Sequence, residues 1–256
     1  MHVVINADDF GLSEAVNEAI RQSFEQGWIS SASVMANMPS FESAVDLTHR
    51  YRLVGKVGVH LNLTQGGSLT TDIRSQQRLC SQSGELCARP RDLFLISSAE
   101  QSAIQTEFRA QILACRRLGI EPSHLDSHHH VHTSWSVGRV TVALAIENGI
   151  PFVRLAHNTG SGVSRAHKLY SLLFNRQLRR RDLGGVKRFC ALPYATKKML
   201  STPGGIELMA HPVIDASGEI VDSVYGNPLG PLVRGLLSGR SCVSYGDLAL
   251  RARDRK

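Results

Sequence analysis

A histidine-rich segment, residues 124–132, carries the side chains of this chain that are best suited to hold a metal ion. Five of its nine residues are histidines and a sixth is an aspartate: His124, His128, His129, His130, His132 and Asp126. Imidazole nitrogens and carboxylate oxygens are common ligands of divalent transition metals. The segment therefore predicts a metal-dependent enzyme.

Further candidate side chains lie at or just beyond the ends of apolar runs that predict buried strands. They are Asp8, Asp9, His60, Arg154 and His211. A catalytic metal site needs about three protein ligands and an open position for water. Asp9, His60 and His128 would supply one carboxylate and two imidazoles. Asp8 is then the candidate general base and His211 the candidate general acid.

The remaining polar residues of the histidine-rich segment have supporting roles in this hypothesis. If the chain stays extended after Asp126, His128 and His130 point to one side. His124, His130 and His132 are candidates to orient a ligand or to contact the substrate. Asp126 is a candidate to hold a ligand histidine by its second ring nitrogen.

Each candidate also has a simpler structural explanation. Asp8 and Asp9 could cap the helix that follows them. His60, taken alone, could form hydrogen bonds within a sheet. Arg154 could orient Asp8, bind a carboxylate, or form a surface ion pair. The catalytic interpretation depends on all these groups meeting in one place.

Apolar runs alternate with amphipathic stretches, and this alternation predicts the elements that must position the candidates. Predicted strands cover residues 3–7, 32–36, 57–63, 123–126, 151–155 and 206–210. Predicted helices cover residues 14–25, 41–51, 99–118, 137–148, 165–181 and 232–237. This pattern is typical of an α/β fold with a mostly parallel sheet. Five separate strand ends supply polar groups, which favours a distorted or incomplete TIM-like (β/α) barrel over an open doubly wound sheet.

No repeat, linker or composition break divides the 256 residues, so we predict a single domain over residues 1–256. Residues 66–97 and 160–195 depart from the regular rhythm, and we expect them to be insertions at the rim of a substrate cavity. Residues 250–256 are expected to form a basic tail. The sequence leaves the oligomeric state open, with a homodimer as one possibility.

The charge and cysteine content narrow the functional classes. The net charge is +7, with arginine and lysine concentrated in residues 176–188 and 251–256. A solvated helix face and tail would explain this excess, and peripheral contact with an anionic membrane is the alternative. No nucleic-acid-binding signature accompanies the charge, so we expect no nucleic acid partner.

Five scattered cysteines without a C-x-x-C pair predict free thiols in a reducing cytoplasm. The N-terminus enters a predicted strand at once, which argues against a secretory signal. No apolar run approaches the roughly 20 residues that span a bilayer. We therefore expect a cytoplasmic protein, with the inner membrane face as a peripheral location.

Three segments resemble motifs of the YdjC-like carbohydrate deacetylases, a family that includes chitooligosaccharide and hopanoid-associated glycolipid deacetylases. They are residues 6–13 (NADDFGLS), 57–64 (VGVHLNLT) and 124–132 (HLDSHHHVH). Val153-Arg154 and Ala210-His211-Pro212 resemble its later motifs, so that the match runs to about residue 215.

The resemblance implies a distorted (β/α) barrel that removes N-acetyl groups from an amino sugar. It places one divalent metal ion on Asp9, His60 and His128, with Asp8 as base. His211 as acid rests partly on analogy with the NodB-type polysaccharide deacetylases. Family members are usually described with Mg²⁺, whereas two imidazoles suit Zn²⁺ or another transition ion better. The metal identity stays open.

The substrate and the reaction each have alternatives. The Leu-rich and Arg-rich helix within residues 160–195 suggests a lipid-linked sugar, although ordinary packing against a barrel explains the leucines equally well. A histidine-rich barrel could also be a phosphoesterase, which often uses two metal ions about 4 Å apart. A non-catalytic protein that binds a sugar is the third hypothesis.

Overall fold

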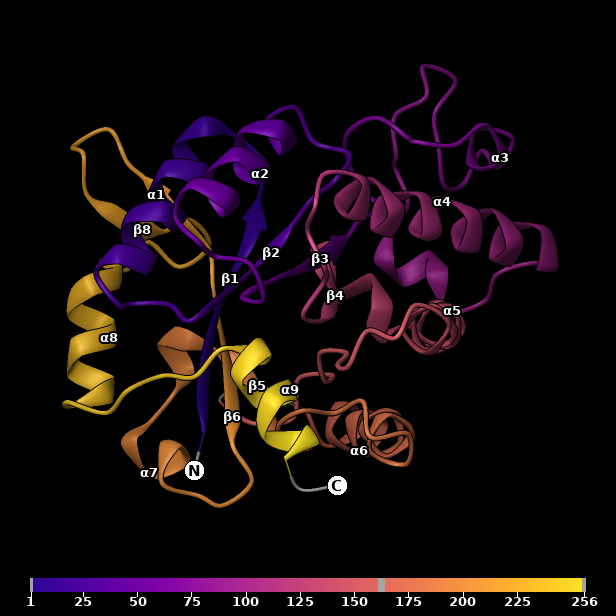
Figure 1. Cartoon of the computed structure of the whole chain (residues 1–256). Coiled ribbons are helices and arrows are strands. Elements are labelled where there is room, and N and C mark those ends of the chain that lie inside the picture. The colour runs from indigo at the N-terminus through magenta and orange to yellow at the C-terminus, as the bar shows by residue number, and fades with distance from the viewer. Residues whose placement is uncertain (1, 161–163, 255–256) are drawn as a thin grey trace.

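Six parallel strands form the curled sheet at the centre of the molecule. The computed structural model describes residues 2–160 and 164–254. The strands are β1 (Val3–Phe10), β2 (Ser31–Val34), β3 (Val57–Leu61), β4 (Leu125–Ser127), β5 (Arg188–Ala191) and β6 (Ile206–Ala210). Their order is β4-β3-β2-β1-β6-β5, and every neighbouring pair is parallel (Figure 1). The expected α/β fold with a distorted TIM-like barrel is confirmed.

An irregular segment, residues 152–158, lies between the two edges of the sheet. On one side, Leu125 donates its backbone N–H to Phe152 at 2.9 Å, and Arg154 donates to Leu125 at 2.9 Å. On the other side, the backbone N–H of Phe189 donates to the side chain of Asn158 at 3.0 Å. The prediction of a regular strand over 151–155 is wrong, because only Val153 forms a bridge to β4. This side-chain hydrogen bond and one backbone bond, from the N–H of Asn158 to the carbonyl of Phe189 at 3.4 Å, connect this side in place of a regular ladder.

Helices surround the sheet. The longer ones are α1 (Glu14–Glu25), α2 (Phe41–Arg50), α4 (Ser98–Arg117), α5 (Trp135–Glu147), α6 (Arg165–Arg179), α8 (Leu229–Leu237) and α9 (Tyr245–Arg253). Short turns are α3 (Thr71–Arg74), α7 (Lys197–Leu200), η1 (Pro90–Leu93), η2 (His128–Thr133) and η3 (Leu192–Tyr194). A small antiparallel hairpin joins β7 (Pro212–Ile214) to β8 (Ile220–Asp222). Capping boxes at Ser97 and Ser244 satisfy the first backbone N–H groups of α4 and α9.

Helix α6 and strand β5 both lie within residues 165–191 and belong to the barrel itself. This corrects the expectation that residues 160–195 form an insertion. Phe174 and Leu178 of α6 are buried, and β5 pairs with β6 inside the sheet. Residues 161–163 lie outside the described residues. The basic tail also needs correction, because residues 250–253 belong to α9, while residues 255 and 256 lie outside the described residues.

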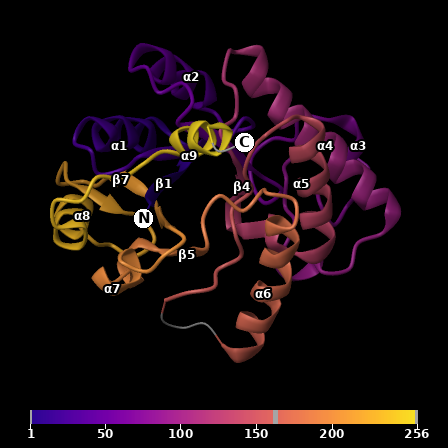
Figure 2. The same ribbon diagram turned by 60° about the horizontal axis from the view of Figure 1, so that its bottom comes forward.

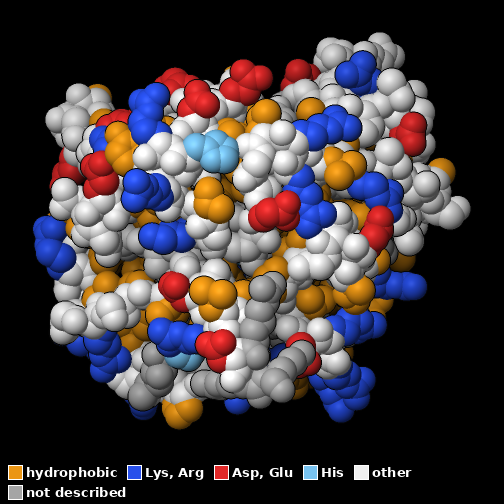
Figure 3. Space-filling model, in the orientation of Figure 1, with side chains coloured by type: hydrophobic (Ala, Val, Ile, Leu, Met, Phe, Trp, Pro, Cys, Tyr) orange, Lys and Arg blue, Asp and Glu red, His pale blue; other side chains and the backbone are white. Residues whose placement is uncertain are grey.

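Figure 2 brings forward the face on which the strands begin, where α9 lies across the base of the sheet beside the N-terminus. Lys and Arg side chains are spread over the face shown in Figure 3, with acidic side chains between them. None of the five cysteines is paired in a disulfide, as the sequence predicts. Among the described residues, no helix is both long and apolar enough to cross a bilayer.

The long segment between β3 and α4 is anchored by one buried carboxylate. Glu107 of α4 is fully buried and accepts hydrogen bonds from the backbone N–H groups of Leu69 and Thr70. It also accepts a hydrogen bond from the hydroxyl of Thr70 at 2.7 Å. This contact holds the start of the segment over residues 66–97 against the barrel.

Replacement of that carboxylate, Glu107→Ala, is expected to release the start of the segment. Four donors lose this acceptor, the side-chain amide of Gln111 included, and each buried unsatisfied donor costs roughly 1–3 kcal/mol before relaxation. We expect a lower free energy of unfolding in urea and faster hydrogen exchange at the amides of Leu69 and Thr70. The matched control is Glu147→Ala, which removes a half-exposed carboxylate paired with Arg109 and should cost less than about 1 kcal/mol. Unchanged exchange at Leu69 would contradict the anchoring role.

Candidate metal centre and catalytic site

The end of β1 places two adjacent carboxylates in the mouth of the barrel. Consecutive side chains of a regular strand point to opposite faces. Here the backbone of Asp9 has φ +69°, and the pairing with β2 shifts register between Ala7 and Phe10. Aspartate tolerates this left-handed conformation better than most residues. The irregularity lets Asp8 and Asp9 both reach groups from other strands.

Asp9, His60 and His128 converge into one group, hereafter the metal-type cluster. The Asp9 Oδ1 atom lies 2.8 Å from His128 Nδ1 and 3.2 Å from His60 Nε2. One potential ligand atom from each residue lies within 4.8 Å of the others. Asp9 and His128 are partly exposed, at 11 % and 12 % of their side-chain areas. The cluster therefore opens toward solvent, as a site with room for water or substrate must.

The surroundings of His60 fit a metal ligand. Its Nδ1 lies 2.8 Å from Asp126 Oδ1, and Ser33 Oγ donates to Asp126 Oδ2 at 2.8 Å. A histidine that donates its Nδ1–H to a carboxylate keeps the lone pair of Nε2 for a cation. Burial alone would lower the pKa of His60, but Asp126, Asp8 and Asp9 raise it to about 10. This concentration of negative charge attracts a cation, and a divalent ion would compete with the proton there.

A second group, Asp8, His60 and Asp126, also has metal-type spacing. It is fully buried, and Arg154 already donates to both of its carboxylates. The guanidinium thus supplies the positive charge at this position. The geometry favours the metal-type cluster as the place for an ion.

Arg154 holds Asp8 through two parallel hydrogen bonds. Its Nη1 donates to Asp8 Oδ2 at 2.7 Å and its Nη2 to Asp8 Oδ1 at 2.6 Å. Asn6 donates to the same Oδ1 at 2.9 Å. Burial raises the pKa of the Asp8 carboxyl, but Arg154 and His60 together bring it below its usual range. Asp8 is therefore an oriented anion, and the role of Arg154 as its orienting partner is the one the contacts favour.

His211 lies on the other side of Asp8, with its Nε2 4.0 Å from Asp8 Oδ2. The β7–β8 hairpin brings Asp222 to His211, whose backbone N–H donates to Asp222 Oδ2 at 2.9 Å. Burial would lower the pKa of His211, but Asp222, Asp8 and Asp9 together raise it. The imidazole thus favours its protonated form, which a general acid requires.

The other histidines of residues 124–132 are distributed differently from the expectation. The chain does not stay extended after β4, because η2 begins at once and His129 and His130 have φ +51° and +55°. The ring of His129 packs against that of His128, with centroids 4.0 Å apart and the planes tilted by 41°. His130 packs edge-on against Phe189 instead of joining the metal-type cluster.

His124 and His132 also lie apart from the metal-type cluster. His124 is fully buried, and its ring stacks on Tyr245 with centroids 4.1 Å apart. Burial lowers its pKa to about 4. His132 is buried between Ser127 and the backbone carbonyl of Arg154, at 2.6 and 3.2 Å. It supports the segment that carries Arg154.

Several residues that contact the site escape sequence reasoning. They are Asn6, Ser33, Gln65, Glu207, Asp222 and Tyr245. Asn6 precedes Asp8 by two positions, so strand periodicity could have placed both on one face. Glu207 is a charged residue inside the apolar run 206–210, and a fully buried charge needs a partner. The sequence carries no comparable signal for Tyr245.

Glu207 and Tyr245 continue the hydrogen bonds of the site to the base of the barrel. Arg154 Nε donates to Glu207 Oε1 at 2.7 Å, and the hydroxyl of Tyr245 donates to Glu207 Oε2 at 2.5 Å. Burial raises the pKa of Glu207 to about 6, against the opposing effect of Arg154. The buried chain Tyr245–Glu207–Arg154–Asp8 therefore links α9 to the mouth of the barrel.

Tyr245→Phe is expected to lower stability while leaving most of the activity. The change removes the described donor to Glu207 Oε2 and should cost about 1–3 kcal/mol of unfolding free energy. The bonds between Arg154 and Asp8 remain, so kcat/KM should fall by less than about tenfold. Urea unfolding and steady-state kinetics measure both effects. Tyr51→Phe, at a side chain on the surface, is the control and should stay within about 0.5 kcal/mol. Equal stability of the two variants would contradict a stabilising role for the Tyr245 hydroxyl.

The fold and the site together define a distorted (β/α) barrel with a carboxylate–imidazole cluster at the carboxyl ends of its strands. A family model described as YdjC-like protein matches residues 2–228. A carbohydrate deacetylase from Halalkalibacterium halodurans is 34% identical over 217 residues, which are 83% of this chain and 85% of that protein. This chain belongs to the YdjC-like family.

Two further comparisons agree with this assignment. A carbohydrate deacetylase from Clostridium beijerinckii is 38% identical over 151 residues, 59% of each chain. A crystal structure from Enterococcus faecalis V583, described as a cellobiose-phosphate cleavage protein, superposes with a TM-score of 0.73. That match covers 96% of this chain and 98% of the other at 21% identity, and it supports the fold.

Proposed function

We propose that this protein is a metal-dependent carbohydrate deacetylase that hydrolyses the N-acetyl amide of an amino sugar. The single observation that carries the proposal is the convergence of the metal-type cluster with Asp8 and His211 at one barrel mouth. The carbohydrate deacetylases among its relatives support the same reaction. Five free thiols are typical of a protein in the reducing cytoplasm, where we place it.

Asp9, His60 and His128 are the residues that would hold the ion. A divalent cation at this position supplies polarisation of the amide carbonyl and a lower pKa for a neighbouring water molecule. The donor set of two imidazoles and one carboxylate favours Zn²⁺ or another transition ion, while the family resemblance favours Mg²⁺. Metal analysis of the purified protein distinguishes the two.

The chain's own residues provide the proton transfers. Asp8 accepts a proton from the attacking water, because Arg154 keeps its carboxylate ionised and fixed in orientation. His211 donates a proton to the nitrogen of the amide as the C–N bond breaks, because Asp222 and Asp8 favour its protonated form. One water molecule is consumed, and acetate and the free amino sugar are released.

The geometry favours one ion over the pair expected of a phosphoesterase. Within residues 2–160 and 164–254, the two groups with metal-type spacing share His60. Arg154 already neutralises the second of them, since it donates to both Asp8 and Asp126. A second divalent cation beside this guanidinium would meet strong repulsion.

We extend the proposal to lipid-linked amino sugars, because of the outer face of α6. Leu169, Leu172 and Leu173 are 61%, 56% and 50% exposed, so packing against the barrel accounts for Leu178 alone among the leucines of this helix. Arg176 and Arg180 lie next along the same outer face. A basic helix with exposed leucines can rest on an anionic membrane surface, where a glycolipid would be presented.

The deciding experiment measures acetate release from diacetylchitobiose and from an N-acetylglucosaminyl lipid. The expected result is release of acetate together with an equal amount of free amine. A chelator should stop the reaction, and one divalent metal ion per chain should restore it. Faster turnover of the lipid than of the soluble sugar would support the extension to glycolipids. Failure to release acetate from any N-acetylated sugar, with metal bound, would reject the proposal.

A further inference from the structure

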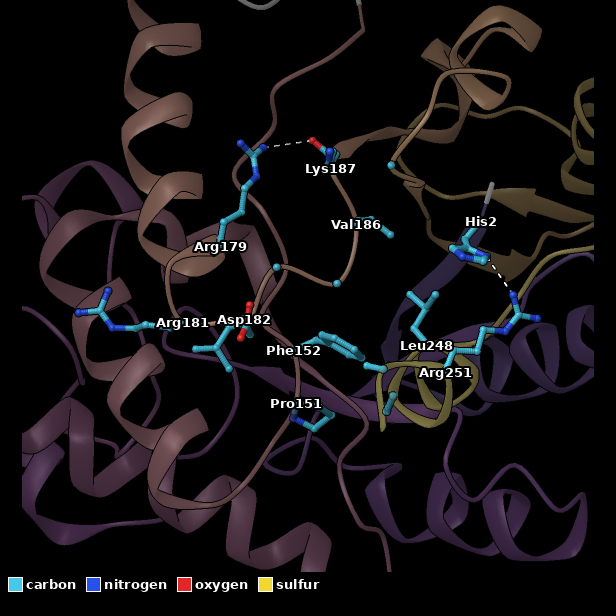
Figure 4. A pocket seen from close by; sticks show the side chains of 16 residues that line it. His2, Pro151, Phe152, Arg179, Arg181, Asp182, Val186, Lys187, Leu248 and Arg251 are labelled. Atoms are coloured by element: carbon cyan, nitrogen blue, oxygen red, sulfur yellow. Dashed lines mark hydrogen bonds between the residues drawn. The ribbon is translucent and has the colours of Figure 1, made fainter. Parts of the chain in front are cut away.

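The two basic segments of the sequence meet at one cavity on the face opposite the metal-type cluster. Arg179, Arg181 and Lys187 come from the first segment and Arg251 from the second. All four line a cavity of about 800 Å³ between the C-terminal end of α6, the loop before β5, and α9. We call it the basal pocket. Figure 4 shows these side chains around the opening, with His2 beside Arg251.

The cations of the basal pocket lack close acidic partners among the described residues, and Arg251 interacts only at longer range with Asp247 of the same helix. Among the described residues, none of the four lies within ion-pair distance of a carboxylate, although Asp182 also lines the cavity. Arg179 donates instead to the backbone carbonyl of Lys187, and Arg251 contacts the ring of His2 at 3.1 Å. Four exposed cations around one concave surface produce a positive potential that attracts anions.

The floor of the basal pocket is apolar. Phe152, Leu183, Val186 and Leu248 line it, and each is at most 7% exposed. Gly185 has φ +56° and lies over Phe152, where a Cβ atom would come within 3.1 Å of the ring. The absence of a side chain at this position keeps the floor open. Concave sites with an apolar lining and a few charged groups are typical of small-ligand sites, and the volume falls in their usual range.

We propose that the basal pocket binds a phosphate-headed amphiphile, with its apolar part on the Phe152 floor and its phosphate at the basic rim. Arginine forms paired hydrogen bonds with phosphate oxygens, and lysine adds a point charge. The ligand is either a soluble phosphate ester or the headgroup region of an anionic phospholipid, since both present the same chemistry. The site is separate from the deacetylase chemistry, and its occupancy can be measured without any turnover.

The soluble source is tested by calorimetric titration of the full chain with inorganic phosphate and with butyl, hexyl and octyl phosphate. Affinity should rise along the alkyl series by up to about fourfold per buried CH₂ group. The variant Lys187→Gln/Arg251→Gln should weaken hexyl phosphate binding by at least about tenfold, since charge-assisted contacts are lost at both positions.

A matched control separates the basal pocket from general charge. Arg117→Gln/Arg139→Gln also removes two positive charges, from exposed positions of α4 and α5 that do not line the cavity. We expect it to change the affinity by less than about twofold at physiological salt. Equal losses in the two variants, or an alkyl series with no gain over inorganic phosphate, would overturn the proposal.

The lipid source is tested by sedimentation with vesicles of phosphatidylglycerol and phosphatidylcholine in equal amounts. Binding that is lost in the basal-pocket variant but kept in the control variant identifies a phospholipid as the ligand. Hexyl phosphate binding without such vesicle binding identifies a soluble phosphate ester. If neither probe distinguishes the two variants, the basal pocket does not bind phosphate-headed amphiphiles.

Discussion

His128→Ala is expected to remove both the bound metal and the deacetylase activity. The change deletes one of the two imidazoles in the metal-type cluster and leaves the Asp9 carboxylate with His60 alone. In the proposed mechanism several kcal/mol of transition-state stabilisation depend on the ion, so kcat/KM should fall on the order of a thousandfold. Metal content per chain and acetate release are measured on the same preparation.

The control for this variant is His49→Ala. His49 lies at the end of α2 and contacts the backbone carbonyl of Leu118, away from the barrel mouth. It should keep full metal content and activity. A His128→Ala protein that remains fully active without metal would show that the cluster is not the catalytic centre. A variant that keeps its metal and loses activity would assign His128 to substrate instead.

Arg154→Lys is expected to lower kcat strongly while the metal stays bound. Lysine keeps the charge, but it cannot donate to Asp8, Asp126 and Glu207 with one planar fork. A catalytic group displaced by about 1 Å can cost roughly a hundredfold in rate, and we expect a loss of this size. The mutation acts on the base rather than on the metal ligands, so metal content should be close to that of the parent.

The pH profile gives a second readout for the same variant. Arg154 holds the pKa of the Asp8 carboxyl below its usual range, against the effect of burial. Weaker contacts in the lysine variant should raise that pKa. Because the base must be ionised, the acidic limb of kcat/KM should move to higher pH. Arg109→Lys, at an exposed pair with Glu147, is the matched control and should leave the limb in place. If the acidic limb of kcat/KM stays at the same pH in Arg154→Lys, Asp8 is not the base whose ionisation that limb reports.

Strand ends made the centre of the site predictable. Asp9, His60 and His128 each follow or end an apolar run, and parallel strands bring their carboxyl ends to one face. The structure brings these three side chains together as the sequence predicts. Arg154 also reaches Asp8, although its segment does not form the expected strand.

Other features depend on contacts that no local pattern reveals. β5 is four residues long and begins with Arg188, so it lacks a distinct apolar run. His129 and His130 both have a left-handed backbone, and this conformation sets the direction of their side chains. The composition of the segment does not reveal it. Tyr245 takes its role from tertiary contacts, since its backbone N–H donates to Ser31, 214 positions away.

The position of α9 has a consequence for synthesis on the ribosome. The two carboxylates of β1 are translated before Tyr245, which is added more than two hundred residues later. Until then the bottom of the barrel is not covered by α9, and Glu207 lacks the hydrogen bond from the Tyr245 hydroxyl. Pairings between segments this distant form slowly and leave apolar surface exposed in the meantime. The growing polypeptide is therefore more vulnerable to aggregation and to chaperone capture before α9 docks than after it has docked.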